Sequence, residues 1–380
     1  MDFDLTEDQR ILQEAAREFA ENELAPRAAA SDAAEDFVRE QIELCREMGF
    51  LGMAVSEAYG GSELGAVGTS LVLMEVNRCC ASTGVTLSVH NSLTCESLMR
   101  FGTDEQKQRY LPKLATGEWL GAYALSEAGS GSDAGSLVCK ATKDGEDWVL
   151  DGTKLWISHG DQADLVVVFA RTDADAGTKG ITAFLVETSW DGYTPGKKEK
   201  KMGLRGSSTV ELHLDHVRVP AANVLGEVGR GFPLALSLLD TGRIGIASQA
   251  VGIAQACLEA SIKYAREREQ FGKPIGAFGA IQEKLADMAT RVDAARLLTL
   301  RAASLKDQGK PHGREASMAK LFASRTANEA AKEAVQIHGG AGYTRDFPVE
   351  RYFRDARVTE IYEGTTEIQR LVIARSLLAS

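Results

Sequence analysis

The chain has 380 residues, of which 44% are hydrophobic and 26% charged, with 37 glycines and 8 prolines. This composition is typical of a globular protein of two or three domains and excludes a disordered or collagen-like chain. The 43 basic and 54 acidic residues give a net charge of −11, which opposes binding to nucleic-acid phosphates, so we expect no nucleic-acid partner. The longest apolar runs fall far short of the roughly 20 residues that span a bilayer, and the N-terminus is acidic rather than basic. We therefore expect a cytoplasmic protein that does not cross a membrane.

Disulfide and metal chemistry are not indicated. The six cysteines form no C-x-x-C pair and are sparse for a chain of this length, so we expect reduced and mostly buried thiols. His213 and His216 lie in a segment of alternating apolar and polar residues, where residues three apart should fall on opposite faces of a strand. We therefore expect no metal site.

In chain order, residues 1–118 are predicted to form an α-helical domain. Segments 6–9 and 103–106 have the capping-box pattern, in which a Thr hydroxyl accepts from the third helical N–H and a Gln side chain reaches back. Apolar residues at helical spacing follow the first box, which predicts one buried helix face. Residues 119–228 are predicted to form a β domain, because short β-branched or aromatic runs alternate with Gly-rich breaks. These runs are 148–150, 154–157, 165–170, 181–186 and 210–219. Helical patterns return over 229–380, and residues 244–265 are apolar nearly all round, which indicates a helix buried on several sides.

Several common catalytic motifs are missing. No G-x-G-x-x-G follows a predicted strand, no phosphate-binding P-loop sequence is present, and no serine elbow stands in a strand-turn-helix context. These absences disfavour a Rossmann dinucleotide site, an NTP-driven reaction and a serine hydrolase.

Five polar or glycine-rich stretches could carry chemistry, and each has a simpler structural explanation. They are 125–133, 156–158, 266–272, 336–343 and 361–367. The first offers hydroxyls and unhindered backbone N–H groups, which suit a heteroaromatic edge or a phosphate but also a plain surface loop. The second places a Trp beside a Ser, for core packing or for a flat cofactor. The last puts a carboxylate between an aromatic residue and a glycine, where catalysis and plain surface charge are equally supported.

Taken together and in this order, these stretches resemble the acyl-CoA dehydrogenase family, nearest to its short-chain, butyryl-type members. The likeness covers almost the whole chain and includes segments 201–209, 239–247 and 354–357. It implies an α+β multidomain fold, with an α-helical N-terminal domain, a middle β-barrel or sandwich domain and a C-terminal four-helix bundle.

The resemblance also implies a homotetramer with one FAD per subunit. By that similarity the pyrophosphate and adenosine part of FAD is contacted by Arg268 and Phe271 and, from a neighbouring subunit, by Gln336, Gly339 and Gly340. The FAD-binding positions implied are Leu125, Ser126, Gly131, Ser132, Trp156, Ile157, Ser158, Arg268, Phe271, Gln336, Gly339, Gly340, Thr365 and Glu367. The positions implied to line the acyl-CoA site are Ser132, Asp240, Arg243 and Gly364. One position departs from the family pattern: Gly279 stands where a Gln that contacts FAD is expected.

The reaction implied is the α,β-dehydrogenation of an acyl-CoA thioester to the trans-2-enoyl-CoA, a step of fatty acid β-oxidation, with electrons passing to an electron-transferring flavoprotein. The resemblance assigns the catalytic base to Glu363, because the family's alternative position falls at Gly242, which has no side chain to take a proton. Three alternatives stay open: a branched or medium-chain substrate, an oxidase that reduces oxygen, and an acyl-CoA or flavin binding module without catalysis.

Overall fold

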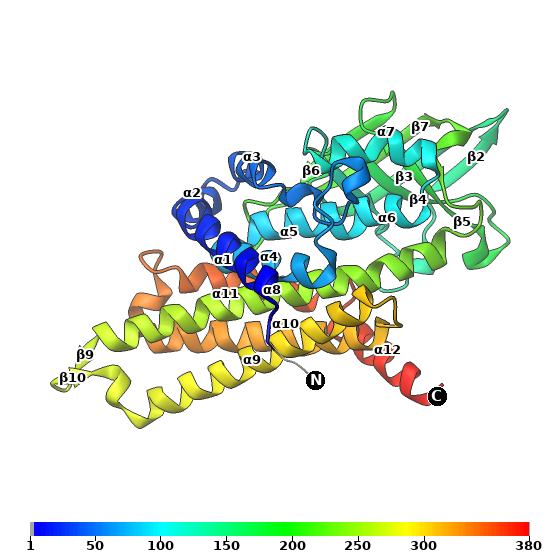
Figure 1. The fold of residues 1–380 in the computed structure, drawn as a ribbon. Helices are drawn as coiled ribbons and strands as arrows, with labels where there is room; N and C mark the ends of the chain where they lie inside the picture. The colour runs from blue at the N-terminus through cyan, green and yellow to red at the C-terminus, as the bar shows by residue number, and fades with distance from the viewer. Residues whose placement is uncertain (1–3, 380) are drawn as a thin grey trace.

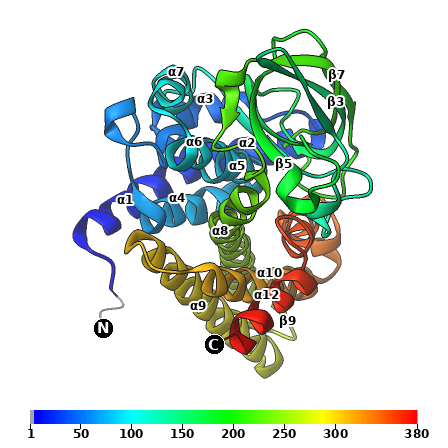
Figure 2. The same ribbon diagram turned by 90° about the vertical axis from the view of Figure 1, so that its right-hand side faces the viewer.

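The structure is a computed structural model that describes residues 4–379. Figure 1 shows helices α1 to α7 and a β-sheet in the upper part of the molecule, with the long helices α8, α9 and α10 extending beneath them. The view turned by 90° separates the N-terminal helices, the sheet and the C-terminal helices (Figure 2). The predicted three-part fold class is confirmed.

The N-terminal region is helical. Both predicted capping boxes form: Gln9 N donates to Thr6 Oγ1 at 3.2 Å, and Gln106 N donates to Thr103 Oγ1 at 3.2 Å. Helices α4 and α5 are buried along nearly their whole length, because other helices cover them on several sides. The helices are α1 (Glu7–Phe19), α2 (Ala25–Ala34), α3 (Arg39–Glu47), α4 (Gly65–Cys79), α5 (Ala81–Val89), α6 (Glu96–Phe101) and α7 (Asp104–Ala115).

The middle region is a sheet in which most strands pair antiparallel, while β1 pairs parallel with β4. In the described part of the chain the order is β6-β7-β3-β2-β4-β5-β8, with β1 beside β4. Strands β4 and β5 are buried on both faces, which explains their continuous apolar runs. The strands are β1 (Gly121–Ala124), β2 (Lys140–Asp144), β3 (Asp147–Ser158), β4 (Leu165–Arg171), β5 (Ile181–Glu187), β6 (Tyr193–Lys198), β7 (Thr209–Val219) and β8 (Val224–Leu225).

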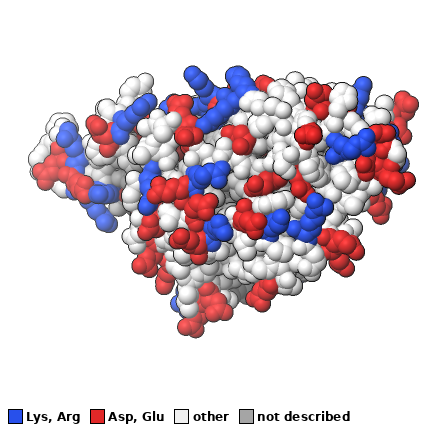
Figure 3. Space-filling view, turned by 90° about the horizontal axis from the view of Figure 1, so that it is seen from above, with Lys and Arg blue, Asp and Glu red and all other residues white. Residues whose placement is uncertain are grey.

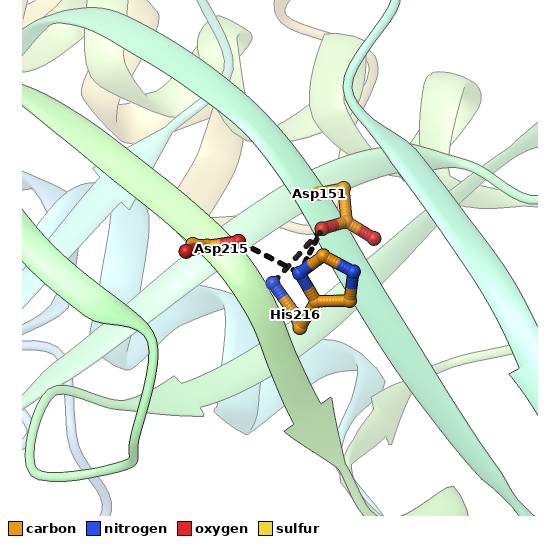
Figure 4. Close-up of side chains that lie close together, drawn as sticks. All are labelled: Asp151, Asp215 and His216. Atoms are coloured by element: carbon orange, nitrogen blue, oxygen red, sulfur yellow. Dashed lines mark hydrogen bonds and ion pairs between the residues drawn. The ribbon is translucent and has the colours of Figure 1, made fainter.

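A β-bulge in β7 corrects the prediction for the histidine pair. The register between β3 and β7 shifts so that Asp215 and His216 stand opposite Asp151, and His216 takes a φ of 55°. The shift interrupts the alternation, so His213 and His216 are both exposed instead of lying on opposite faces. Figure 4 shows the His216 imidazole between the two carboxylates, with Nδ1 2.7 Å from Asp215 Oδ1 and 3.3 Å from Asp151 Oδ1. These contacts stabilise the bulge at the sheet surface, and the hydrogen bond to Asp215 raises the pKa of His216.

The C-terminal region contains the longest helices. Helix α8 is buried without interruption from Thr241 to Ala254, as its apolar sequence predicts. Small residues let it approach α4 closely: a Cβ on Gly252 would lie 2.4 Å from the Met74 carbonyl oxygen. Helices α11 and α12 pack against α10. The elements are α8 (Gly231–Glu267), β9 (Glu269–Gln270), β10 (Lys273–Pro274), α9 (Gly279–Asp307), α10 (Gly313–His338), α11 (Val349–Arg357) and α12 (Thr366–Leu378).

The charged side chains and the cysteines are placed as expected from the composition. Figure 3 shows acidic and basic side chains interspersed over the face seen from above. The six cysteines are free and buried. Among residues 4–379, no helix combines the length and apolar character needed to cross a membrane.

Candidate active site

The segment before α12 presents Glu363 to the interior. Glu363 and Gly364 both have left-handed backbones, with φ values of 50° and 93°. A left-handed glutamate is uncommon, because its Cβ crowds the backbone, whereas glycine adopts this conformation freely. The turn directs the Glu363 side chain toward α8, where a Cβ on Gly242 would lie 2.0 Å from Glu363 Oε2. The glycine at 242 is therefore the reason that the carboxylate fits against this helix.

The Glu363 carboxylate is buried and unpaired. Neither of its oxygens has a hydrogen-bond partner among the described residues. Burial raises the pKa of Glu363 to about 7, although the positive charges of Lys320 and Arg243 act to lower it. A carboxylate with this pKa is partly ionised at neutral pH and can both take up and release a proton.

Two tyrosines stand near this carboxylate. The Tyr123 hydroxyl, on β1, is buried and has no hydrogen-bond partner among residues 4–379, while the Tyr362 hydroxyl is bonded to Gln249 on α8. Burial, together with the Glu363 charge, raises the pKa of both tyrosines well above the usual value. Buried polar atoms without partners are costly. Their clustering at the junction of β1, α8 and the Glu363 turn is therefore typical of a ligand site.

The predicted substrate positions on α8 lie beside this turn. Arg243 Nη1 donates to Asp240 Oδ1 at 2.5 Å, and the Arg243 guanidinium lies close enough to Glu363 for the two charges to interact. Burial raises the pKa of Asp240, against the lowering effect of Arg243. Arg243 Nε is buried and unpaired within the described chain. Gly364 completes this group, while Ser132 lies exposed on the loop of the β domain.

The loop over 125–133 is fixed to β3 by a buried ion pair. Lys154 Nζ donates to Glu127 Oε1 at 2.7 Å and to the Leu125 carbonyl at 3.2 Å, and the Lys154 side chain is fully buried. Leu155 N also donates to the Ser126 carbonyl at 2.9 Å. Since Leu125 directly follows β1 and Tyr123, these bonds connect the loop to the surroundings of Glu363. The hydroxyl of Ser126 and the open backbone at Gly131 remain available as donors.

Trp156 stands out in β3. The pairing of β3 with β7 is irregular between Lys154 and Ile157, and Trp156 has a φ of 63° with 63% of its surface exposed. The irregularity directs a large aromatic ring away from the sheet core. Ile157 packs into that core, so it offers a ligand only its backbone, and Ser158 is half-buried. An exposed aromatic plane beside hydroxyls and free N–H groups fits a flat ring with polar edges, such as the flavin of FAD.

The positions predicted for the adenosine end of FAD lie elsewhere. Arg268 is about 39 Å along α8 from Gly242, at 1.5 Å per residue. Tyr264 on the same helix stacks on His338 of α10 at 4.2 Å between ring centroids, so the end of α10 lies here too. Arg268 and Phe271 follow α8 at this end, in the segment that forms β9 and β10 (Figure 1), while Gln336, Gly339 and Gly340 lie at the end of α10.

Arg268 and Phe271 thus lie far from Glu363 of the same chain, at the end where the positions expected to reach a neighbouring subunit's FAD also lie. Phe271 is 94% exposed, which suits a contact with another chain.

The remaining predicted positions lie around α12 and α9. Thr365 is the N-cap of α12, and its hydroxyl accepts from Ile368 N at 3.4 Å. Glu367 is exposed in the first turn. Gly279 begins α9, and a Cβ added there would meet no other atom within 4 Å, so the missing side chain leaves open space.

The sequence analysis missed Tyr123, Lys320 and Gln369. Lys320 Nζ and Gln369 Nε2 both donate to the Gly364 carbonyl, at 2.5 and 2.8 Å. The available signal was a lysine among mostly apolar residues in 316–323 and a single glutamine in the last helical segment. Neither pattern distinguishes a functional side chain from a surface one.

The fold, with a buried unpaired carboxylate and an exposed aromatic ring beside free donors, is typical of a flavin-dependent enzyme. Three family models cover nearly the whole chain: the acyl-CoA dehydrogenase N-terminal domain at 6–118, middle domain at 122–217 and C-terminal domain at 229–378. The chain belongs to the acyl-CoA dehydrogenase family.

Individual proteins agree with this assignment. The mitochondrial short-chain specific acyl-CoA dehydrogenase of Bos taurus is 50% identical over 99% of this chain and 92% of its own length. The structure of butyryl-CoA dehydrogenase from Megasphaera elsdenii has 43% identity and a TM-score of 0.98, with complete coverage of both chains. A chain in a structure of the electron transferring flavoprotein of Acidaminococcus fermentans has 46% identity and a TM-score of 0.99, again over both whole chains.

Proposed function

We propose that this protein catalyses the FAD-dependent α,β-dehydrogenation of a short-chain acyl-CoA thioester, with Glu363 as the catalytic base. The observation that carries the proposal is the buried and unpaired Glu363 carboxylate, held against Gly242 by a left-handed turn. The product is the trans-2-enoyl-CoA. Its relatives support a short acyl chain, since both the Bos taurus and the Megasphaera elsdenii proteins are named for short substrates.

FAD supplies the acceptor, at flavin N5, for the hydride that leaves the β-carbon. Residues of the 125–132 loop and Trp156–Ser158 would hold the flavin, and Thr365 and Glu367 would flank it. The Arg268, Phe271, Gln336, Gly339 and Gly340 group of a second subunit would hold the pyrophosphate and adenosine. This division of the site between two ends of the chain supports a homo-oligomer, which we propose is a homotetramer.

Glu363 removes the α-proton. A proton beside a thioester is weakly acidic, so the carbonyl oxygen must be stabilised as negative charge develops on it. The backbone N–H of Glu363 is the donor that the family relationship favours for this role.

The acyl-CoA would be lined by Asp240, Arg243, Gly364 and Ser132. The Gln249 and Tyr362 pair places polar groups two turns along α8 from Gly242, where a long apolar chain would be poorly accommodated.

Electrons then pass to an electron-transferring flavoprotein, as the likeness to the Acidaminococcus fermentans structure supports. An oxidase is the alternative, and the rate at which reduced enzyme is reoxidised in air separates the two. A binding module without catalysis is disfavoured because Glu363 is present.

A cytoplasmic location is proposed from the bacterial relatives, and fractionation of native cells tests it.

The test is anaerobic stopped-flow bleaching of the flavin after mixing with butyryl-, octanoyl-, palmitoyl- or isovaleryl-CoA. Butyryl-CoA should bleach the flavin fastest, and the rate should rise with pH through about 7 as Glu363 ionises. Glu363→Gln keeps the side-chain shape but removes its basicity, so bleaching should slow by about 10²–10⁴-fold while FAD stays bound. Glu360→Gln, a change to a nearby carboxylate, should bleach normally.

Near-normal bleaching in Glu363→Gln would show that another group takes the proton. Faster bleaching with octanoyl- or isovaleryl-CoA would replace the short-chain substrate by the medium-chain or branched alternative. A purified protein that neither contains FAD nor takes it up would contradict the function itself.

A further inference from the structure

Lys320 is an unusual residue for its position on α10. Only 1% of its surface is exposed, and it lies among the fully buried alanines Ala316, Ala319 and Ala323. Burying an ammonium group is costly unless nearby groups compensate its charge. A lysine that persists in such a helix therefore needs a partner that explains it.

The partner is the turn that carries Glu363. Lys320 Nζ donates to the Gly364 carbonyl at 2.5 Å, and Gln369 Nε2 donates to the same oxygen at 2.8 Å and to the Glu363 carbonyl at 3.3 Å. The peptide that follows Gly364 is thus held from α10 by Lys320 and from α12 by Gln369, while the peptide between Glu363 and Gly364 is held by Gln369 alone. Two charged or polar donors on one carbonyl fix the orientation of the turn more firmly than one.

The charges around the carboxylate single out Lys320. Arg243, on α8, is the other cation that acts on Glu363, but it is already bonded to Asp240 at 2.5 Å. Lys320 makes no ion pair within 4.0 Å in the described part of the chain, and it does act on Glu363 and, more weakly, on Glu360 and Glu367. The other titratable groups that face Glu363 are Tyr123 from β1 and Tyr362 from its own turn, and these are neutral at working pH.

We propose that Lys320 is a positioning residue for Glu363: its ammonium group holds the left-handed turn through the Gly364 carbonyl, and its positive charge favours the ionised form of the buried carboxylate, which accepts the proton. The inference rests on the proposed function, because it takes Glu363 as the base.

The direction of the pH effect follows from the charges. Burial raises the pKa of Glu363 to about 7, and the Lys320 charge opposes that rise. Removing an opposite charge that acts on a buried carboxyl raises its pKa, by about one to three units where the two charges lie within about 4–6 Å. Glu363 would then ionise at higher pH, so the rate of flavin bleaching at pH 7 should fall by about fivefold or more and recover in alkaline buffer.

The experiment compares three variants and one control variant of the FAD-loaded protein by anaerobic bleaching with butyryl-CoA across pH. Lys320→Gln keeps a donor but removes the charge, and Lys320→Met removes both. Both should move the midpoint of the pH–rate curve upward by about one unit or more. Gln369→Leu removes the neutral donor to the same carbonyl, so it should lower the rate without moving the midpoint. Lys332→Met is the charge control, since that exposed lysine lies about 18 Å further along α10.

Folded, FAD-loaded Lys320→Gln and Lys320→Met with the wild-type midpoint would overturn the inference, as would an equal shift in Lys332→Met. If neither Lys320 variant folds, Lys320→Arg decides, because it keeps the charge and should keep the midpoint; an upward shift there would overturn the inference. Glu363→Gln, measured alongside, separates the two proposals. Slow bleaching in that variant with no Lys320 effect refutes only the role of Lys320, whereas normal bleaching refutes the assignment of the base.

Discussion

At the residue scale, the site depends on two backbone positions that accept glycine for different reasons. Gly364 continues the left-handed turn, with a φ of 93°. Gly242 leaves room for the carboxylate of Glu363, since a Cβ there would lie 2.0 Å from Oε2. The first is a conformational requirement and the second is a steric one. The carboxylate of Glu363, on the segment before α12, therefore fits against α8 because the facing residue, Gly242, has no side chain.

This steric requirement gives a prediction for Gly242→Ala. The added methyl group would displace the carboxylate, and a misplacement of about 1 Å can lower the rate by about 10²-fold. The same change should not weaken the fold of α8, because alanine favours a helix interior by about 1 kcal/mol over glycine. We expect slow flavin bleaching with an unchanged or higher unfolding temperature. Gly279→Ala, at a helix start with open space around it, is the matched control and should bleach at the wild-type rate. Equal rates in the two variants would contradict this account.

At the element scale, the sequence predicted the regular parts of the fold well and the edges poorly. The runs at 165–170 and 181–186 match β4 and β5 within a residue at each end, because strands buried on both faces carry continuous apolar sequence. Strand β6 (Tyr193–Lys198) was missed, since it contains Pro195, Gly196 and two lysines and lies at the sheet edge, where such residues are tolerated.

The same distinction holds for the site. Glu363 could be proposed from the sequence because its neighbours form a motif, whereas Lys320 could not, because a lone lysine in a helix has no distinctive pattern. The bulge at His216 was missed because a register shift depends on pairing between distant strands, which local alternation does not show.

The Lys154–Glu127 ion pair gives the element-scale prediction. Lys154→Met would leave the Glu127 carboxylate buried with only backbone donors, from Val138 N at 2.7 Å and Cys139 N at 3.0 Å. Breaking a buried pair on one side costs about 3–5 kcal/mol of unfolding free energy. FAD should also dissociate more readily, because the 125–133 loop loses its attachment to β3. The double variant Glu127→Gln, Lys154→Met removes both charges and keeps one of the two acceptor oxygens, so urea unfolding should show part of the loss restored. A double variant no more stable than Lys154→Met would refute this explanation.

At the scale of the whole molecule, the chain carries its proposed FAD contacts at two distant ends. The loop at 125–132, Trp156 and Glu363 lie at one end, and Arg268 and Phe271 lie at the other, beyond most of the length of α8. Helix α9 is exposed along much of its length, and Phe271 and Tyr343 are 94% and 88% exposed. Large exposed aromatic residues are enriched in surfaces that contact other chains. A symmetric oligomer would bring one chain's far end to the other chain's Glu363.

Complementation between two inactive variants tests this arrangement. Glu363→Gln keeps a normal far end, while the double variant Arg268→Glu, Phe271→Asp keeps a normal Glu363. Each alone should be nearly inactive in butyryl-CoA bleaching. When both chains are expressed together, random pairing makes about half of the pairs mixed. Each mixed pair has two sites, and one of them combines a normal Glu363 with a normal far end. About a quarter of the wild-type activity should therefore return. Light scattering should show a tetramer for the wild type. Mixing the two variants without any gain in activity, or a fully active monomer, would mean that each chain binds its FAD alone and that the far-end residues serve another purpose.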